Sequence, residues 1–166
     1  MSDRAAILTA FLAAHGLGDA ARTPLAGDAS TRSYERLTLG DGRSLIFMNQ
    51  PPAAEAAPCP PDATPEQRRA AGYNAMARLA AGSVDAFVAC AAWLKDQGLS
   101  APAIIAADAS QGLAVLEDLG DGLYAALIAE GADEGELYDA AVDALVALHH
   151  ASPPAVLTGG GASWPL

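Results

Sequence analysis

Lysine is almost absent from this 166-residue sequence. Lys95 is the only one among nine lysine and arginine residues, which face twenty aspartate and glutamate residues and leave a formal net charge of −11. Proteins that bind nucleic acids neutralise phosphates with Lys and Arg, so we expect no nucleic-acid partner. The two cysteines, Cys59 and Cys90, cannot form a disulfide framework, and no Cys/His spacing indicates zinc.

Long hydrophobic runs are also missing. The most apolar run, residues 86–94, is far shorter than the roughly 18 residues that would cross a bilayer. The N-terminal residues lead into an amphipathic stretch and not into the apolar core of a signal peptide. We therefore expect a cytoplasmic protein that does not enter a membrane. With 52% hydrophobic residues the chain can fold, and its length fits about one domain.

Two common phosphate-binding loops do not occur. The sequence has neither GxxxxGK[ST] nor GxGxxG, so P-loop and Rossmann folds lack their main support. The glycine run 159–161 is typical of a flexible tail. His149 and His150 are adjacent on a predicted helix and point about 100° apart, so they do not share a metal ion. We expect one of them to pack and the other to be solvated.

The apolar spacing predicts an α+β fold. Two pairs of β-prone segments, 34–39 with 44–48 and 103–107 with 113–116, indicate antiparallel hairpins, the first around a turn that contains Asp-Gly. Runs of antiparallel strands with inserted helices favour α+β over a doubly wound parallel sheet. Helices are predicted over 5–14, 65–81, 84–97, 122–130 and 134–150. From Pro153 onward we expect a loop.

The last predicted helix has a regular apolar face. Leu137, Ala141, Leu145 and Leu148 recur at helical spacing. Such a stripe is typical of a helix that packs on a core.

Residues 25–36 form the first candidate binding segment. A strand leads into Gly27 and then into small polar residues, and such a tip can aim successive backbone N–H groups at an anion. Ser30 and Thr31 add hydroxyl donors, and Arg32 adds a charge-assisted contact to a phosphate. The alternative is an ordinary polar turn in which Asp28 bonds its own backbone.

Residues 112–122 form the second such segment. An apolar strand ends in Glu117-Asp118-Leu119-Gly120, where backbone groups leave the sheet and can meet the edge of a purine. The alternative is a strand end followed by an acidic helix cap.

Together these segments resemble a known family. Gly27-Asp28-Ala29-Ser30, with Arg32 and Tyr34, is similar to the GDAS-x-R-x-Y signature of the aminoglycoside phosphotransferase-like kinases. The resemblance is strongest to the bacterial anomeric N-acetylmuramate/N-acetylglucosamine kinases of cell-wall recycling. It continues in the same order over nearly the whole chain, through residues 44–52, 98–102, 115–121 and 137–149.

The resemblance implies a protein-kinase-like N-terminal lobe (residues 1–119) followed by the start of a helical second lobe (residues 120–166). By this analogy, residues at three places bind the nucleotide, ATP or another NTP. The loop over the phosphates is Gly27, Asp28, Ala29, Ser30, Thr31 and Arg32; the hinge beside adenine is Glu117, Asp118 and Leu119; Met48 takes the place of the lysine that pairs a phosphate in many kinases. Since no lysine is present there, Arg32 is the candidate replacement.

The catalytic half of the family pattern is missing. Residues 151–166 contain no Asp, Glu, Asn or His, so they hold neither an HxDxxxxN-type loop nor a metal-binding Asp. The chain therefore looks like part of an amino-sugar kinase that uses ATP and Mg²⁺, and we predict that it self-associates or needs the missing half. Two alternatives stay open: a non-catalytic, acidic binding or adaptor module on a kinase-like scaffold, and an ordinary domain with a coincidental match.

Overall fold

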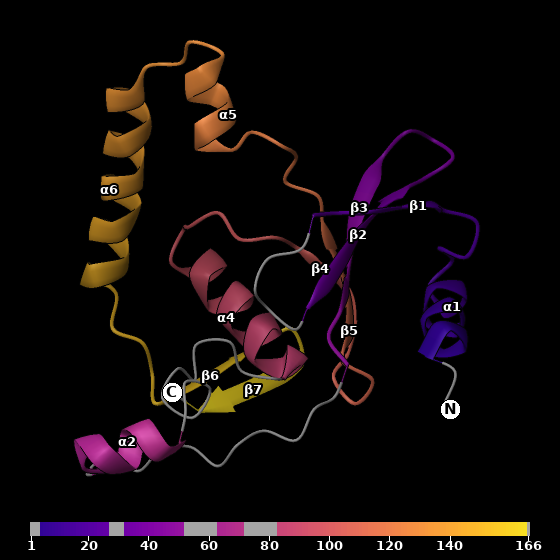
Figure 1. The fold of residues 1–166 in the computed structure, drawn as a ribbon, viewed down its shortest axis with the longest axis horizontal. Helices are drawn as coiled ribbons and strands as arrows, with labels where there is room; N and C mark the ends of the chain where they lie inside the picture. Colours follow the sequence, from indigo (N-terminus) through magenta and orange to yellow (C-terminus); the bar gives the residue numbers. More distant parts are fainter. Residues whose placement is uncertain (1–3, 27–31, 52–62, 72–82, 166) are drawn as a thin grey trace.

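A computed structural model describes residues 4–26, 32–51, 63–71 and 83–165 (Figure 1). The elements follow one another as a sheet with helices inserted between and after its strands, which confirms the α+β class. They are α1 (Arg4–Ala14), β1 (Ala21–Pro24), β2 (Ser33–Thr38), β3 (Ser44–Asn49), α2 (Pro65–Ala71), α4 (Val84–Asp96), β4 (Ile104–Asp108), β5 (Leu113–Glu117), α5 (Tyr124–Ala129), α6 (Glu134–His150), β6 (Val156–Gly159) and β7 (Ala162–Pro165).

Five strands form one antiparallel sheet in the order β1-β2-β3-β5-β4. Both predicted hairpins are confirmed, the first as β2 and β3 and the second as β4 and β5. In the β2–β3 turn the Asp41 carboxylate accepts a hydrogen bond from the backbone N–H of Arg43 at 3.0 Å. Gly42 has a φ of 85°, which explains why this position carries glycine.

The sheet has a helix on each face. Side chains alternate along each strand, so one set of strand residues faces α1 and the other faces α4. The α1 face packs Phe11, Leu12 and Leu17 against Leu37, Phe47, Leu113 and Val115. The α4 face packs Val84 and Val88 against Met48, Ala114 and Leu116. The two faces therefore form two separate cores.

The predicted C-terminal loop is wrong, because β6 and β7 form a hairpin there. This hairpin packs on α4, and its Leu157 is buried. A Cβ at Gly159 would overlap the Cβ of Ala92, so glycine is what allows the close approach. Gly160 and Gly161, with φ values of 58° and 83°, make the turn. A glycine run has no hydrophobic period, which is why the sequence indicated a flexible tail.

The predicted helices at 122–130 and 134–150 are confirmed as α5 and α6, but the predicted core face of α6 is not buried. No residue of α5 or α6 is buried, and Leu145 is 55% exposed. Figure 1 shows the pair standing beside the sheet and not on it. The expectation that one of the two terminal histidines packs is also wrong, since His149 and His150 are both exposed.

The helix predicted from residue 65 begins as expected. Thr64 and Gln67 form reciprocal hydrogen bonds, in which the Thr64 hydroxyl accepts from the Gln67 N–H at 3.2 Å and the Gln67 amide oxygen accepts from the Thr64 N–H at 2.8 Å. The remainder of that predicted helix, 72–81, lies outside the described residues. No described helix has both the length and the apolar character needed to cross a membrane.

Candidate functional site

The α4 face of the sheet carries both candidate segments. Tyr34, Ile46 and Met48 belong to the cluster that packs around α4. Because β2 side chains alternate, Arg36 lies on this same face, two residues after Tyr34. Asp118 likewise follows Leu116 of β5 on this face. The two segments therefore lie on one side of one sheet. The part of this side that runs from Arg32 to Leu119 is called the strip.

Arg32 lies at the end of this strip where β2 begins. Its Nε donates to Gln50 Oε1 at 3.2 Å, and its guanidinium carbon lies 5.9 Å from the centre of the Phe87 ring on α4. Gln50 is the one polar residue that is buried as a whole among the described residues, and its backbone N–H donates to the carbonyl of Gly112. Buried Gln50 and Phe87 of α4 thus position the Arg32 guanidinium at this end of the strip. The other predicted loop residues, Gly27, Asp28, Ala29, Ser30 and Thr31, lie outside the described residues.

Met48 lies within the sheet beneath the strip. Its side chain has no exposed surface and packs in the α4 core with Val84 and Val88. At this position a kinase-like lysine would need an acidic partner on the facing helix. The buried α4 residues of this cluster are Val84 and Val88, so the neighbours that α4 offers Met48 there are apolar.

The other end of the strip is the segment after β5. Glu117 is tied to the start of β4, since its backbone N–H donates to the Ala103 carbonyl at 2.8 Å and its carboxylate accepts from the Ala103 N–H at 2.9 Å. Leu119 is different. Its side chain is 60% exposed, and within the described residues its backbone N–H and carbonyl have no hydrogen-bond partner. Among the described residues, the backbone N–H and carbonyl of Leu119 are therefore open to a ligand.

Asp118, the remaining hinge residue, is engaged in an ion-pair cluster. Arg36 Nε lies 2.7 Å from its carboxylate, and Arg36 also lies 2.7 Å from Asp121. A hydrogen bond from the Ser44 hydroxyl, together with the Arg36 contact, lowers the pKa of Asp118. The Arg36 contact lowers the pKa of Asp121, and the two carboxylates raise the pKa of Arg36. Both acids are therefore anionic at neutral pH.

The strand register sets the distance between the two ends. The row of paired residues next to Arg32 is Ser33, Asn49 and Leu113, and the row at the other end is Leu37, Leu45 and Glu117. Four residue steps along a strand separate these rows, which is about 14 Å at ~3.4 Å per residue. The two segments do not meet at one point. They lie at opposite ends of one strip of the sheet.

Residues 21–164 match the phosphotransferase enzyme family (APH). The chain belongs to this family. An N-acetylmuramate/N-acetylglucosamine kinase of Caulobacter vibrioides is 64% identical over 165 residues, which are 99% of this chain and 45% of the relative. A protein of the same name in Pseudomonas aeruginosa is 32% identical over 134 residues, 81% of this chain and 31% of the relative. The chain thus spans less than half the length of these relatives.

Membership in the phosphotransferase family confirms the resemblance drawn from the motifs. The five-stranded antiparallel sheet with flanking helices is consistent with a kinase-like N-terminal lobe. The domain division after residue 119 stays a prediction, and the β6–β7 hairpin packs back on α4, which precedes that division.

Sequence reasoning missed three members of this site. Gln50 and Phe87 support Arg32, and Arg36 pairs with Asp118 and Asp121. For Arg36 a signal was present, because strand alternation places it on the same face as Tyr34. For Gln50 there was none, since a polar residue at a strand end is ordinarily exposed. Within the described ranges, no group of three or more His, Cys, Asp or Glu residues could hold a metal ion.

Proposed function

We propose that this chain is the nucleotide-binding part of an ATP-dependent kinase for amino sugars of the cell wall. The observation that carries the proposal is the strip on the α4 face, with the Arg32 cation at one end and the open backbone of Leu119 at the other. The names of the two relatives point to N-acetylmuramate or N-acetylglucosamine as the class of acceptor. A place in cytoplasmic cell-wall recycling belongs to the same proposal.

In the complete reaction, the γ-phosphoryl group of ATP moves to a sugar hydroxyl, which loses its proton, and ADP leaves. Catalysis of this kind consists mainly of positioning and of neutralising charge. Arg32 would neutralise phosphate charge together with the loop 27–31, while the N–H and carbonyl of Leu119 would meet the base edge. Met48, which has no exposed surface, would lie beneath the strip and not touch the ligand.

Among the described residues, no group of three or more His, Cys, Asp or Glu side chains could hold a metal ion, and the two acids that lie together, Asp118 and Asp121, are engaged by Arg36. We therefore assign Mg²⁺ ligation and the handling of the acceptor hydroxyl to polypeptide outside these 166 residues. The proposal for this chain alone is nucleotide binding without phosphoryl transfer. Residues 151–166 contain no Asp, Glu, Asn or His side chain that could take part in transfer.

Titration of the chain with ATP·Mg²⁺ tests the phosphate end of the strip. We expect Arg32→Ala to weaken binding about 10- to 100-fold, because a hydrogen bond to a charged group contributes about 1.5–3 kcal/mol. Ser30→Ala removes a neutral donor and is expected to cost about threefold to tenfold. Calorimetry or a fluorescent ATP analogue gives the dissociation constants.

Arg43→Ala is the matched control for this titration. Arg43 is an exposed turn arginine that pairs with Asp41, so its loss should leave ATP affinity unchanged. Unchanged affinity in both Arg32→Ala and Ser30→Ala would remove the phosphate assignment. A wild-type chain that binds no ATP would overturn the proposed function altogether.

The exposed apolar face of α6 leads to a separate expectation about association. Tyr138, Val142, Leu145 and Val146 are each about half exposed, and large exposed apolar patches mark interaction sites. We propose that the isolated chain self-associates through this face when the remaining half of the kinase is absent. Light scattering should then give an apparent mass above 16.7 kDa that rises with concentration.

The double variant Val142→Lys, Val146→Lys should shift the chain toward monomer, because two charges would interrupt the apolar stripe. Val156→Lys is the control, since Val156 is similarly exposed on β6, outside that face. A compact wild-type monomer at high concentration would contradict the expectation.

A further inference from the structure

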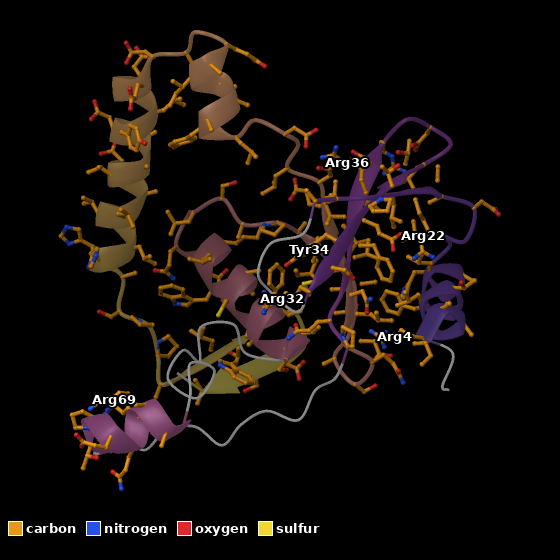
Figure 2. The ribbon with its side chains drawn as sticks, in the orientation of Figure 1. Arg4, Arg22, Arg32, Tyr34, Arg36 and Arg69 are labelled. Atoms are coloured by element: carbon orange, nitrogen blue, oxygen red, sulfur yellow. The ribbon has the colours of Figure 1, made fainter. Side chains whose placement is uncertain are left out.

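Arg36 uses all three guanidinium nitrogens on two carboxylates. Its Nε and Nη2 donate to Asp118 at 2.7 and 3.4 Å, and its Nη1 and Nη2 donate to Asp121 at 2.9 and 2.7 Å. Such forked pairing fixes direction as well as distance, which a lysine could not do. Figure 2 shows Arg36 at the end of the sheet from which the chain leaves for α5.

The contact bridges elements that are not neighbours in the sheet. Arg36 lies on β2, which is separated by β3 from β5, the strand that leads to Asp118. Its side chain therefore crosses one strand to reach the segment that follows β5. Here we call residues 118–123 the linker, since they connect β5 to α5.

The Asp118 carboxylate is the buried anchor of the linker. Only 5% of its side chain is exposed, against 78% for Asp121. A buried carboxylate must keep its partners, because an unpaired buried charge is strongly destabilising. Besides Arg36, the Gly120 N–H donates to Asp118 at 2.9 Å, and Gly120 adopts a φ of 81° that allows the chain to turn there.

Among the residues that the structure describes, few other groups hold the linker. Leu119 and Leu123 are 60% and 70% exposed, and α5 buries no residue. Within the described part of the chain, the side-chain hydrogen bonds that tie the linker to the sheet come from Arg36 and Ser44. The direction in which the chain leaves the sheet therefore depends on very few groups.

We infer that Arg36 is a positioning residue, which clamps the linker to the sheet through Asp118 and Asp121. The clamp holds the backbone of Leu119 at the end of the strip and fixes the direction in which α5 departs. The first role rests on the proposed function, because it matters only when a nucleotide base occupies that end. The second role is a property of the fold and is independent of any ligand.

Limited chymotrypsin digestion tests the clamp directly on the 166-residue chain. Leu119, Leu123 and Tyr124 are exposed cleavage sites in or beside the linker, and mass spectrometry identifies the fragments. Cleavage requires the segment to open, so its rate reports how firmly the linker is held. We expect Arg36→Met to speed cleavage at these sites about tenfold, at a temperature where thermal melting shows the variant folded.

Arg22→Met is the matched control. Arg22 forms a similar forked pair with Glu35, at 2.6 and 2.9 Å, on the same sheet but away from the linker. It should leave linker cleavage at the wild-type rate. Asp121→Asn removes only the exposed half of the clamp and should give a smaller rise, so it tests the inference even if Arg36→Met does not fold.

Nucleotide affinity supplies the second readout. Arg36→Met should weaken ATP binding about tenfold, with Arg36→Lys between it and wild type, because lysine keeps the charge but not the fork. The inference that Arg36 clamps the linker would be overturned if Arg36→Met and Asp121→Asn were both cleaved in the linker at the rate seen for Arg22→Met. If wild type binds no ATP, the proposed function and the role at Leu119 both fail, while the cleavage rates still decide whether Arg36 holds the linker.

Discussion

Replacing Phe47 by alanine is expected to lower the free energy of unfolding by about 3–5 kcal/mol, the range for large aromatic side chains lost from a core. Phe47 has no exposed surface and lies on β3, the central strand of the sheet. Its ring stacks on Phe11 of α1 with centroids 6.0 Å apart, and the Arg22 guanidinium lies 5.6 Å from its centre. Removing the ring would leave a cavity where α1 meets the sheet.

Urea denaturation followed by circular dichroism measures this loss. A domain of ordinary stability has about 5–15 kcal/mol in total, so the variant should unfold at a much lower urea concentration. Ile105→Ala on β4 is the control, since Ile105 is 53% exposed and its truncation should cost less than about 1 kcal/mol. Equal losses in the two variants would mean that α1 does not close this face of the sheet.

Local elements of the fold could be predicted because their signals lie close together in the sequence. The β2–β3 hairpin follows from a Gly-Asp-Gly turn between two β-prone runs, and the Asp41 hydrogen bond to Arg43 spans only two residues. The helix starting at Pro65 follows from the adjacent Thr64 cap. In these cases propensity, turn chemistry and tertiary structure agree.

The ion-pair cluster at the hinge could not be predicted in the same way. Arg36 lies 82 and 85 residues before Asp118 and Asp121, and only the strand order brings them together. The sequence predicted the β2–β3 and β4–β5 hairpins, but not that β5 inserts beside β3. Without that pairing, Arg36 is one strand residue among several and the two acids are a possible helix cap.

The C-terminal hairpin shows a different limit. Its glycines carry no hydrophobic period, and their role appears only when Ala92 of α4 is placed against Gly159. The exposed face of α6 is the converse case. The spacing of apolar residues correctly predicted an amphipathic helix over 134–150. The spacing within one helix does not say whether the surface that covers its apolar face belongs to the same chain.

The Met48→Lys variant tests whether the side chain at position 48 faces the nucleotide or packs in the core. Because Met48 is fully buried against valines of α4, Met48→Lys would place an ammonium group in an apolar core. Burial lowers the pKa of a lysine by several units, and three units correspond to about 4 kcal/mol. We therefore expect a loss of about 4 kcal/mol at pH 7, with no gain in ATP affinity.

The pH dependence of this loss identifies its cause. A lysine whose folded pKa lies below its unfolded value of about 10.4 binds fewer protons in the folded state, so stability rises as pH increases. The penalty should be constant below the folded pKa and should vanish as the pH approaches the unfolded value. Met48→Leu keeps the volume without the charge and should cost less than about 1.5 kcal/mol at every pH. Tighter ATP binding by Met48→Lys with unchanged stability would instead show that this side chain faces the phosphates, as the lysine does in many kinases.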